Sequence, residues 1–151
     1  YFEKTLKYAC ILDVYIKRYS NLFLLTKNKN NLNLAELKLA FNQSLDYLNL
    51  SDIDTKLEWE VSGDFDATIC LELYEIFQML LEFYFSYLHS INLSLREEEN
   101  VLKLKINMVP NNEFPEKFDL ENFQNDSKLT ITKDLNHKEN NWTISFERSA
   151  L

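Results

Sequence analysis

Apolar residues recur through the first part of the chain at steps of three and four, and this spacing predicts a helix over residues 2–25. One row has the a/d spacing of a coiled coil or bundle, and it comprises Phe2, Thr5, Ala9, Leu12, Ile16, Tyr19 and Phe23. A second row covers another side and comprises Tyr8, Ile11, Tyr15, Leu22 and Leu25. Because a helix with two apolar faces needs partners on two sides, we expect either a core helix within one domain or a bundle or dimer helix.

The middle of the chain predicts a second helix, a strand and a long third helix. Asn33 followed by Glu36 resembles a capping box at the start of the second helix. Apolar and charged residues alternate in "KLEWEV" (56–61), which predicts a half-buried strand. Asp66 is expected to cap the helix that contains "LELYEIFQMLLEFYFSYLHS" (71–90).

The last third of the chain predicts two hairpins. "NLSLR" (92–96) and "VLKLKINMV" (101–109) flank a short acidic turn, and "KLTIT" (128–132) and "WTISF" (142–146) form the second pair. Residues 110–127 contain both prolines and show no period, so they predict a loop. The expected fold class is α+β: a two-layer α/β sandwich, in which helices cover one face of a mixed sheet of about five strands, preceded by a long bundle helix.

The apolar stretch at 71–90 could be read as a membrane segment, but its polar residues argue against one. They recur every three or four residues and so form one stripe on a helix, comprising Glu72, Glu75, Gln78, Glu82, Ser86 and His89. An acidic residue at the centre of a bilayer costs about 2.5–3.5 kcal/mol on insertion scales, and this stripe has three. We therefore predict a core helix with one edge in water.

Composition limits the classes of function. The chain has 151 residues, enough for one domain with its own core. Its net charge of −8, from 24 acidic and 16 basic residues, argues against a broad surface for nucleic acid or anionic lipid. Cys10 and Cys70 lie in apolar helical runs, which favours buried thiols in a reducing compartment over a disulfide. The chain begins at Tyr1 without an initiator Met or a signal pattern, so we expect a cytoplasmic fragment of a longer protein.

The order of elements resembles the C-terminal half of a bacterial sensor histidine kinase. "VYIKRYSNLFLL" (14–25) and "LNLAELKLAFNQSLDYLNL" (32–50) are similar to a stretch in certain Firmicutes kinases, where a Lys-Arg…Asn-Leu helix end precedes an "eL…al.eSl.yL" helix. The resemblance covers nearly the whole chain and rests on pattern and order. It implies that residues 1–25 end a dimerisation and phosphoacceptor hairpin, and that residues 34–151 form an ATPase domain of the GHKL type.

The nucleotide-binding motifs of that family are missing or altered here. In the family the long helix carries a Glu beside an Asn that holds magnesium, whereas here Phe83 follows Glu82, and residues 69–90 contain no Asn. Glycine-rich turns let the family's backbone amides approach the nucleotide closely, but the only glycine of this chain is Gly63, before the long helix. The resemblance therefore implies a degraded nucleotide site, with no catalytic residue, metal ligand or bound cofactor.

Neither histidine is expected to accept a phosphoryl group. A phosphoacceptor must be an exposed His on a bundle helix, and residues 1–25 contain none. We expect His89 at the end of the long helix, where the helix macrodipole favours a cation, and His137 in a solvated turn. No Cys/His set has metal-ligand spacing, and no serine lies between the glycines of a nucleophile elbow.

These observations predict a histidine-kinase-like signalling domain of a two-component-type sensor protein. ATP binding should be lost or weak, and the domain should act as a regulatory or partner-binding module. We expect a homodimer formed through Leu12, Ile16, Tyr19 and Phe23. A response regulator or another signalling protein is the expected partner, nucleic acid is not, and a membrane would be reached only through upstream segments.

Two alternatives remain open. The first is an active histidine kinase domain with an atypical ATP–magnesium site, in which Glu75 or Glu82 holds the metal with help from loop residues such as Asn122 or Asn125. The second is an unrelated α/β protein-interaction module, which a strand order different from that of the family would favour.

Overall fold

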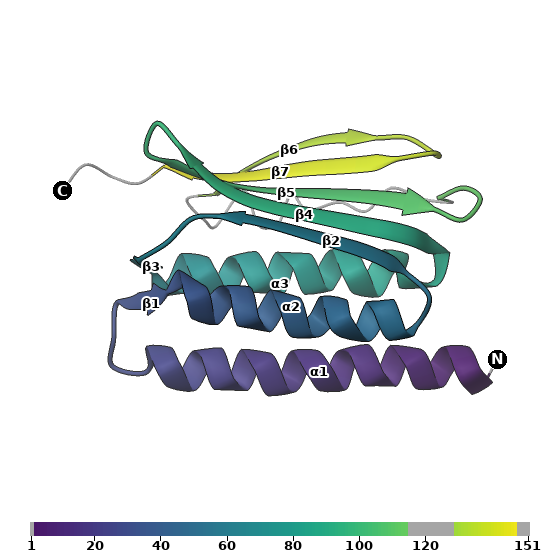
Figure 1. Cartoon of the computed structure of the whole chain (residues 1–151), viewed down its shortest axis with the longest axis horizontal. Coiled ribbons are helices and arrows are strands. Elements are labelled where there is room, and N and C mark those ends of the chain that lie inside the picture. The colour runs from purple at the N-terminus through teal and green to yellow at the C-terminus, as the bar shows by residue number, and fades with distance from the viewer. Residues whose placement is uncertain (1, 115–128, 148–151) are drawn as a thin grey trace. The chain divides into compact units, whose positions relative to one another are not determined.

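The computed structural model describes residues 2–114 and 129–147, which form two compact units (Figure 1). The helical unit comprises Tyr1–Thr55 and Ser62–Ser86, and the sheet unit comprises Lys56–Val61 and Tyr87–Leu151. The helices are α1 (Phe2–Thr26), α2 (Leu34–Leu50), α3 (Ala67–Tyr84) and the short 3-10 helix η1 (Phe85–Tyr87). The strands are β1 (Asn31–Asn33), β2 (Asp54–Glu60), β3 (Asp64–Asp66), β4 (Leu88–Glu98), β5 (Val101–Pro110), β6 (Leu129–Leu135) and β7 (Asn140–Glu147).

Both predicted capping residues, Asn33 and Asp66, cap their helices in the helical unit, but Asn33 bonds Ala35 and not Glu36, as a capping box would require. The side chain of Asn33 accepts a hydrogen bond from the backbone N–H of Ala35 at 2.8 Å, and that of Asp66 accepts one from Ile69 at 3.0 Å. Each cap satisfies one of the backbone donors that a helix start leaves without a partner. The caps therefore fix where α2 and α3 begin.

A two-stranded sheet precedes these two helix starts, and the sequence did not predict it. β1 pairs antiparallel with β3, and Leu32 lies opposite Phe65 in the pair. Both of these side chains are buried. Strands of three residues are too short to show a period of two, so the pattern of the sequence could not reveal them.

Aromatic side chains form the centre of the helical unit. The ring of Tyr74 lies 5.4 Å from that of Phe41 and 6.2 Å from that of Phe77 between centroids. The Tyr74 hydroxyl is paired with the hydroxyl of Ser44 at 2.8 Å, so its polar end is satisfied in the core. Cys70 is a free thiol beside this cluster in sequence, and burial raises its pKa to about 12.

The sheet unit has the strand order β2-β4-β5-β7-β6. β4, β5, β7 and β6 pair antiparallel, and Figure 1 shows β2 running in the same direction as β4. This confirms the predicted α+β class with a mixed sheet of five strands. Glu99 and Asn100 join β4 to β5 with positive φ angles of 50° and 66°, which is the geometry of a two-residue type I′ hairpin turn.

The predicted end of the long helix is wrong. α3 ends at Tyr84, η1 follows, and Leu88 already begins β4, where it pairs with Pro110. His89 therefore lies in a strand and not at a helix end. The reason is that Leu88 and Ile91 are buried in the strand and also continue the helical apolar spacing, so the pattern does not distinguish the two. Most of the predicted loop falls in residues 115–128, outside the described residues.

Candidate functional site

α1 packs against α2 and α3 within the helical unit through one of its two apolar rows. Ile11 and Leu22 from that row are 1% and 2% exposed. Tyr15 lies at the same surface, where its ring stacks on that of Tyr74 at 5.6 Å between centroids. The first helix is therefore a core element of this unit through one face.

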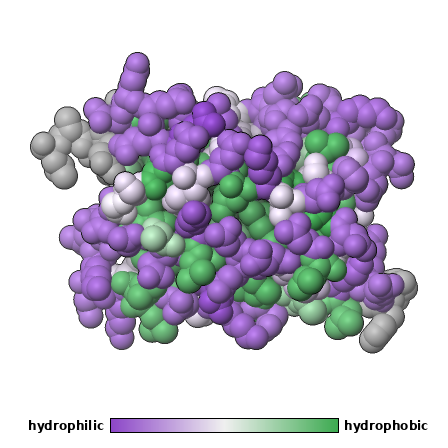
Figure 2. Space-filling view, viewed as in Figure 1, coloured by the Kyte–Doolittle hydropathy of each residue, from purple (hydrophilic) through white to green (hydrophobic). Residues whose placement is uncertain are grey.

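The other row of α1 is open. Ile16 is 59% exposed and Phe23 is 54% exposed, while Leu12 and Tyr19 are half-buried at the border of the packed face. Figure 2 shows apolar side chains on the surface along α1. Two of the four predicted dimer residues thus point away from the unit, and their role as a dimer surface stays a prediction.

Tyrosines of α1 meet acidic residues of α3. The Tyr8 hydroxyl donates a hydrogen bond to the Glu82 carboxylate at 3.4 Å. Partial burial raises the pKa of Glu82, although the hydrogen bond from the Tyr8 hydroxyl stabilises its carboxylate. Burial and then the charge of Glu75 raise the pKa of Tyr15. Tyr8 and Tyr15 are seven residues apart, as are Glu82 and Glu75. Tyr8 contacts Glu82, and Tyr15 is close enough to Glu75 to feel its charge, so the two helices run antiparallel.

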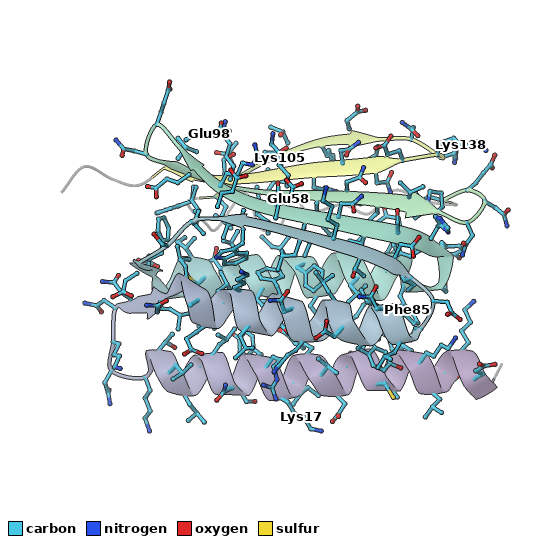
Figure 3. The ribbon with its side chains drawn as sticks, in the orientation of Figure 1. Lys17, Glu58, Phe85, Glu98, Lys105 and Lys138 are labelled. Carbon is cyan, nitrogen blue, oxygen red and sulfur yellow. The ribbon has the colours of Figure 1, made fainter. Side chains whose placement is uncertain are left out.

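A cavity of about 310 Å³ lies beside the Tyr8–Glu82 contact. Its lining comes from the first turns of α1 and from the end of α3 with η1, and it comprises Lys4, Thr5, Tyr8, Glu82, Phe85 and Ser86. Figure 3 labels Phe85 in this region. The lining offers one cation, one acid and three hydroxyl groups, so it can bind polar groups.

The structure does not bring Glu75 and Glu82 together as joint metal ligands. Seven residues along a helix correspond to about 10.5 Å of rise, whereas two carboxylates on one Mg²⁺ each lie about 2 Å from the ion. Among residues 2–114 and 129–147, no group of three or more His, Cys, Asp or Glu side chains could hold a metal ion. An atypical site on either glutamate alone stays a prediction, and Asn122 and Asn125 lie outside the described residues.

His137 has a structural partner that the sequence did not indicate. It lies in the turn between β6 and β7, as expected, but its Nδ1 is 2.8 Å from the carbonyl oxygen of Phe114. The backbone N–H of Phe114 in turn donates to the His137 carbonyl at 3.0 Å. His137 therefore fixes Phe114, which is buried, to the β6–β7 turn.

The sequence contains a signal for the α1–α3 contact beyond the apolar pattern of the two helices. Tyr8 and Tyr15 belong to the second apolar row of the first helix, and Glu75 and Glu82 belong to the polar stripe of the third. The equal seven-residue spacings fit two neighbouring helices, and the pairing of Tyr8 with Glu82 and of Tyr15 with Glu75 makes them antiparallel. Which helices are neighbours, however, depends on the tertiary structure.

Known structures share this architecture. The histidine kinase domain of a blue-light activated histidine kinase from Erythrobacter litoralis superposes with a TM-score of 0.69 at 9% identity, over 91% of this chain and 75% of that one. The histidine kinase AdeS of Acinetobacter baumannii gives 0.55 at 15% identity, over 99% and 84%. The catalytic domain of histidine kinase ThkA gives 0.57 at 10% identity, over 78% and 95%. The chain has the fold of a histidine kinase catalytic domain.

At these identities the likeness to histidine kinases concerns the fold alone. The sequence matches no protein-family model and has no significant similarity to a curated protein. Within the part of the chain that the structure describes, no helix combines the length and the apolar character that crossing a membrane requires.

Proposed function

We propose that this chain is a histidine-kinase-like signalling domain with lost or weak ATP binding, which acts as a regulatory or partner-binding module of a two-component-type sensor protein. A response regulator or another signalling protein is its proposed partner, and the cytoplasm is its proposed location. The histidine kinase fold supports the signalling class. The absence of Asn from residues 69–90 and the single glycine support the loss of ATP binding.

The observation that carries the proposal is the contact between Tyr8 and Glu82. Through the family resemblance, Glu82 matches the acid that stands beside the metal-binding Asn, and here Phe83 takes the place of that Asn. In this chain Glu82 is partly buried, and its carboxylate accepts a hydrogen bond from Tyr8 of α1. The same side chain thus links the position of α1 to α3, which suits a module that responds to a partner bound at its helices.

Calorimetric titration of the 151-residue chain with ATP and Mg²⁺ tests the loss of nucleotide binding. We expect no binding tighter than a Kd of about 100 μM, which corresponds to about 5.5 kcal/mol. The Glu75→Gln and Glu82→Gln variants are the controls, because any residual heat that both leave unchanged does not come from a magnesium site on these residues. Tighter binding that either substitution removes would refute the proposal and favour an active kinase with an atypical site.

We further propose that the open row of α1 forms the homodimer surface. An isologous contact places the same patch of both protomers face to face, and exposed Ile16 and Phe23 supply apolar area at its centre. Lys17 lies on the flank of this row in an ion pair with Asp13 at 2.8 Å, which keeps its charge at the border with water.

Light scattering at micromolar concentration tests the dimer. The wild-type chain should have twice the mass of one protomer, and Ile16→Asp should convert it to a monomer because a buried carboxylate without a partner is strongly disfavoured. Leu50→Asp is the matched control, since Leu50 is 85% exposed at the end of α2, and it should leave the dimer intact. A wild-type chain that is a strict monomer would exclude this surface.

A further inference from the structure

A second candidate site lies within the sheet unit, on the face of the sheet that carries the polar side chains. A groove with a volume of about 480 Å³ runs over β2, β4, β5 and β7. All side chains that line it from this face end in hydrogen-bonding groups, and they are Lys56, Glu58, Asn92, Ser94, Lys105, Asn107, Asn141 and Thr143. Figure 3 labels Glu58 and Lys105 in this unit. No aromatic ring of this face lines the groove, so it suits a polar ligand.

Three asparagines form a directional chain of hydrogen bonds across the groove. Asn107 lies opposite Asn92 on one side and opposite Asn141 on the other. Its amide nitrogen donates to the Glu139 carboxylate at 2.6 Å and to the Asn141 oxygen at 2.8 Å, while its oxygen accepts from the Asn92 nitrogen at 3.0 Å.

The Glu139 carboxylate fixes the direction of this chain. A carboxylate only accepts, so it must face the nitrogen of Asn107, and the orientations of both neighbouring amides follow from that. Among the described residues, the amide oxygen of Asn92 and the amide nitrogen of Asn141 form no hydrogen bond. A ligand in the groove therefore meets one acceptor on β4 and one donor on β7.

The next pair of positions along the sheet carries a cation that forms no close ion pair, although the more distant Glu98 carboxylate attracts it. Lys105 lies directly opposite Ser94 of β4 and Thr143 of β7, so one ammonium group is flanked by two hydroxyl groups. Among the described residues no carboxylate lies within 4.0 Å of the Lys105 ammonium. In contrast, Lys56 is paired with Glu58 at 3.0 Å, and Lys103 is paired with Glu98 at 3.2 Å.

We propose that this groove binds a small phosphate monoester that carries hydroxyl groups. The Lys105 ammonium can bind the outer oxygens of a phosphoryl group, and the hydroxyls of Ser94 and Thr143, one on either side of it, supply further donors. The free acceptor of Asn92 and the free donor of Asn141 then bind the hydroxyl groups of the ligand. A single cation outside any close ion pair, on a chain of net charge −8, suits a small anion and disfavours a polyanion such as nucleic acid.

NMR titration of the 151-residue chain with sn-glycerol 3-phosphate tests this site. Because the groove is open and polar, we expect a Kd of about 1 mM at low salt, with amide shifts centred on Asn92, Lys105 and Asn141. Lys105→Gln and Thr143→Val should each weaken binding about tenfold, since each removes a bond to a charged group. Lys103→Gln and Thr132→Val are the matched controls, because both residues lie outside the groove lining, and they should leave the affinity within about twofold.

Comparison ligands decide the chemistry of the site. Glycerol should not bind, and L-malate, which offers planar carboxylates, should bind more weakly than glycerol 3-phosphate. Equal or tighter binding of L-malate would overturn the assignment to phosphate monoesters. The absence of a saturable shift up to about 20 mM glycerol 3-phosphate, or an equal loss of affinity in Lys103→Gln, would overturn the site itself. These outcomes do not depend on ATP binding or on the dimer surface of α1.

Discussion

Replacing Ile11 and Ile16 separately by alanine separates the two faces of α1. Both are isoleucines of the same helix, but Ile11 is 1% exposed against α2 and α3, whereas Ile16 is 59% exposed. If α1 is a core element of the helical unit, Ile11→Ala must destabilise the folded chain much more than Ile16→Ala. If α1 were only a dimer helix, the two substitutions would have similar effects or the opposite order.

The expected magnitudes follow from the burial of each side chain. Isoleucine to alanine removes three carbons, each of which contributes about 0.8 kcal/mol when fully buried, and the cavity left behind brings the loss at Ile11 to about 2.5–4 kcal/mol. Ile16 loses only the buried part of its side chain, about 1 kcal/mol. For a chain of this length these values correspond to a fall in Tm of about 8–12 °C for Ile11→Ala and of about 3 °C for Ile16→Ala.

Thermal unfolding followed by circular dichroism measures both variants, at a protein concentration low enough to dissociate a dimer. Light scattering on the same samples separates loss of packing from loss of association. Under these conditions an Ile11→Ala variant as stable as the wild-type chain would show that α1 does not pack on α2 and α3, and the assignment of its two faces would have to be reversed.

Two further predictions concern α3. Burial raises the pKa of Glu82 above its usual value of 4.5, so the folded chain holds this proton more tightly than the unfolded chain, and stability falls as the pH rises from 4.5 through the raised pKa. Glu82→Gln should therefore be more stable than the wild-type chain near pH 7 and equally stable below about pH 4. Urea unfolding at both pH values measures this difference, and an equal gain in stability at the two values would contradict the prediction. Asp66→Ala removes the cap of α3 and should lower the free energy of unfolding by about 1 kcal/mol; Asp66→Asn, which keeps an acceptor, should retain most of it, and an equal loss in both variants would mean that the cap bond is not responsible.

Features with a local signal could be predicted from the sequence. The caps at Asn33 and Asp66 depend on one side chain and the backbone of the next turn, and both were found where they were expected. The alternation in residues 101–109 likewise predicted β5, because the period of two is a property of the strand itself. The single glycine and the missing Asn are facts of the sequence that need no structure.

Features that depend on pairing between distant segments could not be predicted. The Tyr8–Glu82 contact joins residues that are 74 positions apart, and the sequence does not say which helices are neighbours. The asparagine chain needs the register of three strands, because a shift of one residue would turn Asn107 to the opposite face of the sheet. The boundary between α3 and β4 was misplaced because both elements bury apolar residues over the same stretch. The expected division into residues 1–25 and 34–151 stays a prediction.

The two units are interlaced in the chain, and this makes β2 important for solubility. β2 comes before α3 in the sequence but pairs with β4, which comes after it. A chain shortened to begin at Tyr87 would keep β4, β5, β6 and β7, yet it would leave the backbone of β4, a strand of 11 residues, unpaired along one side. Such a long free edge is a template for aggregation. β2 covers it and is a poor template itself, because Lys56, Glu58 and Glu60 place charges along a strand of only seven residues.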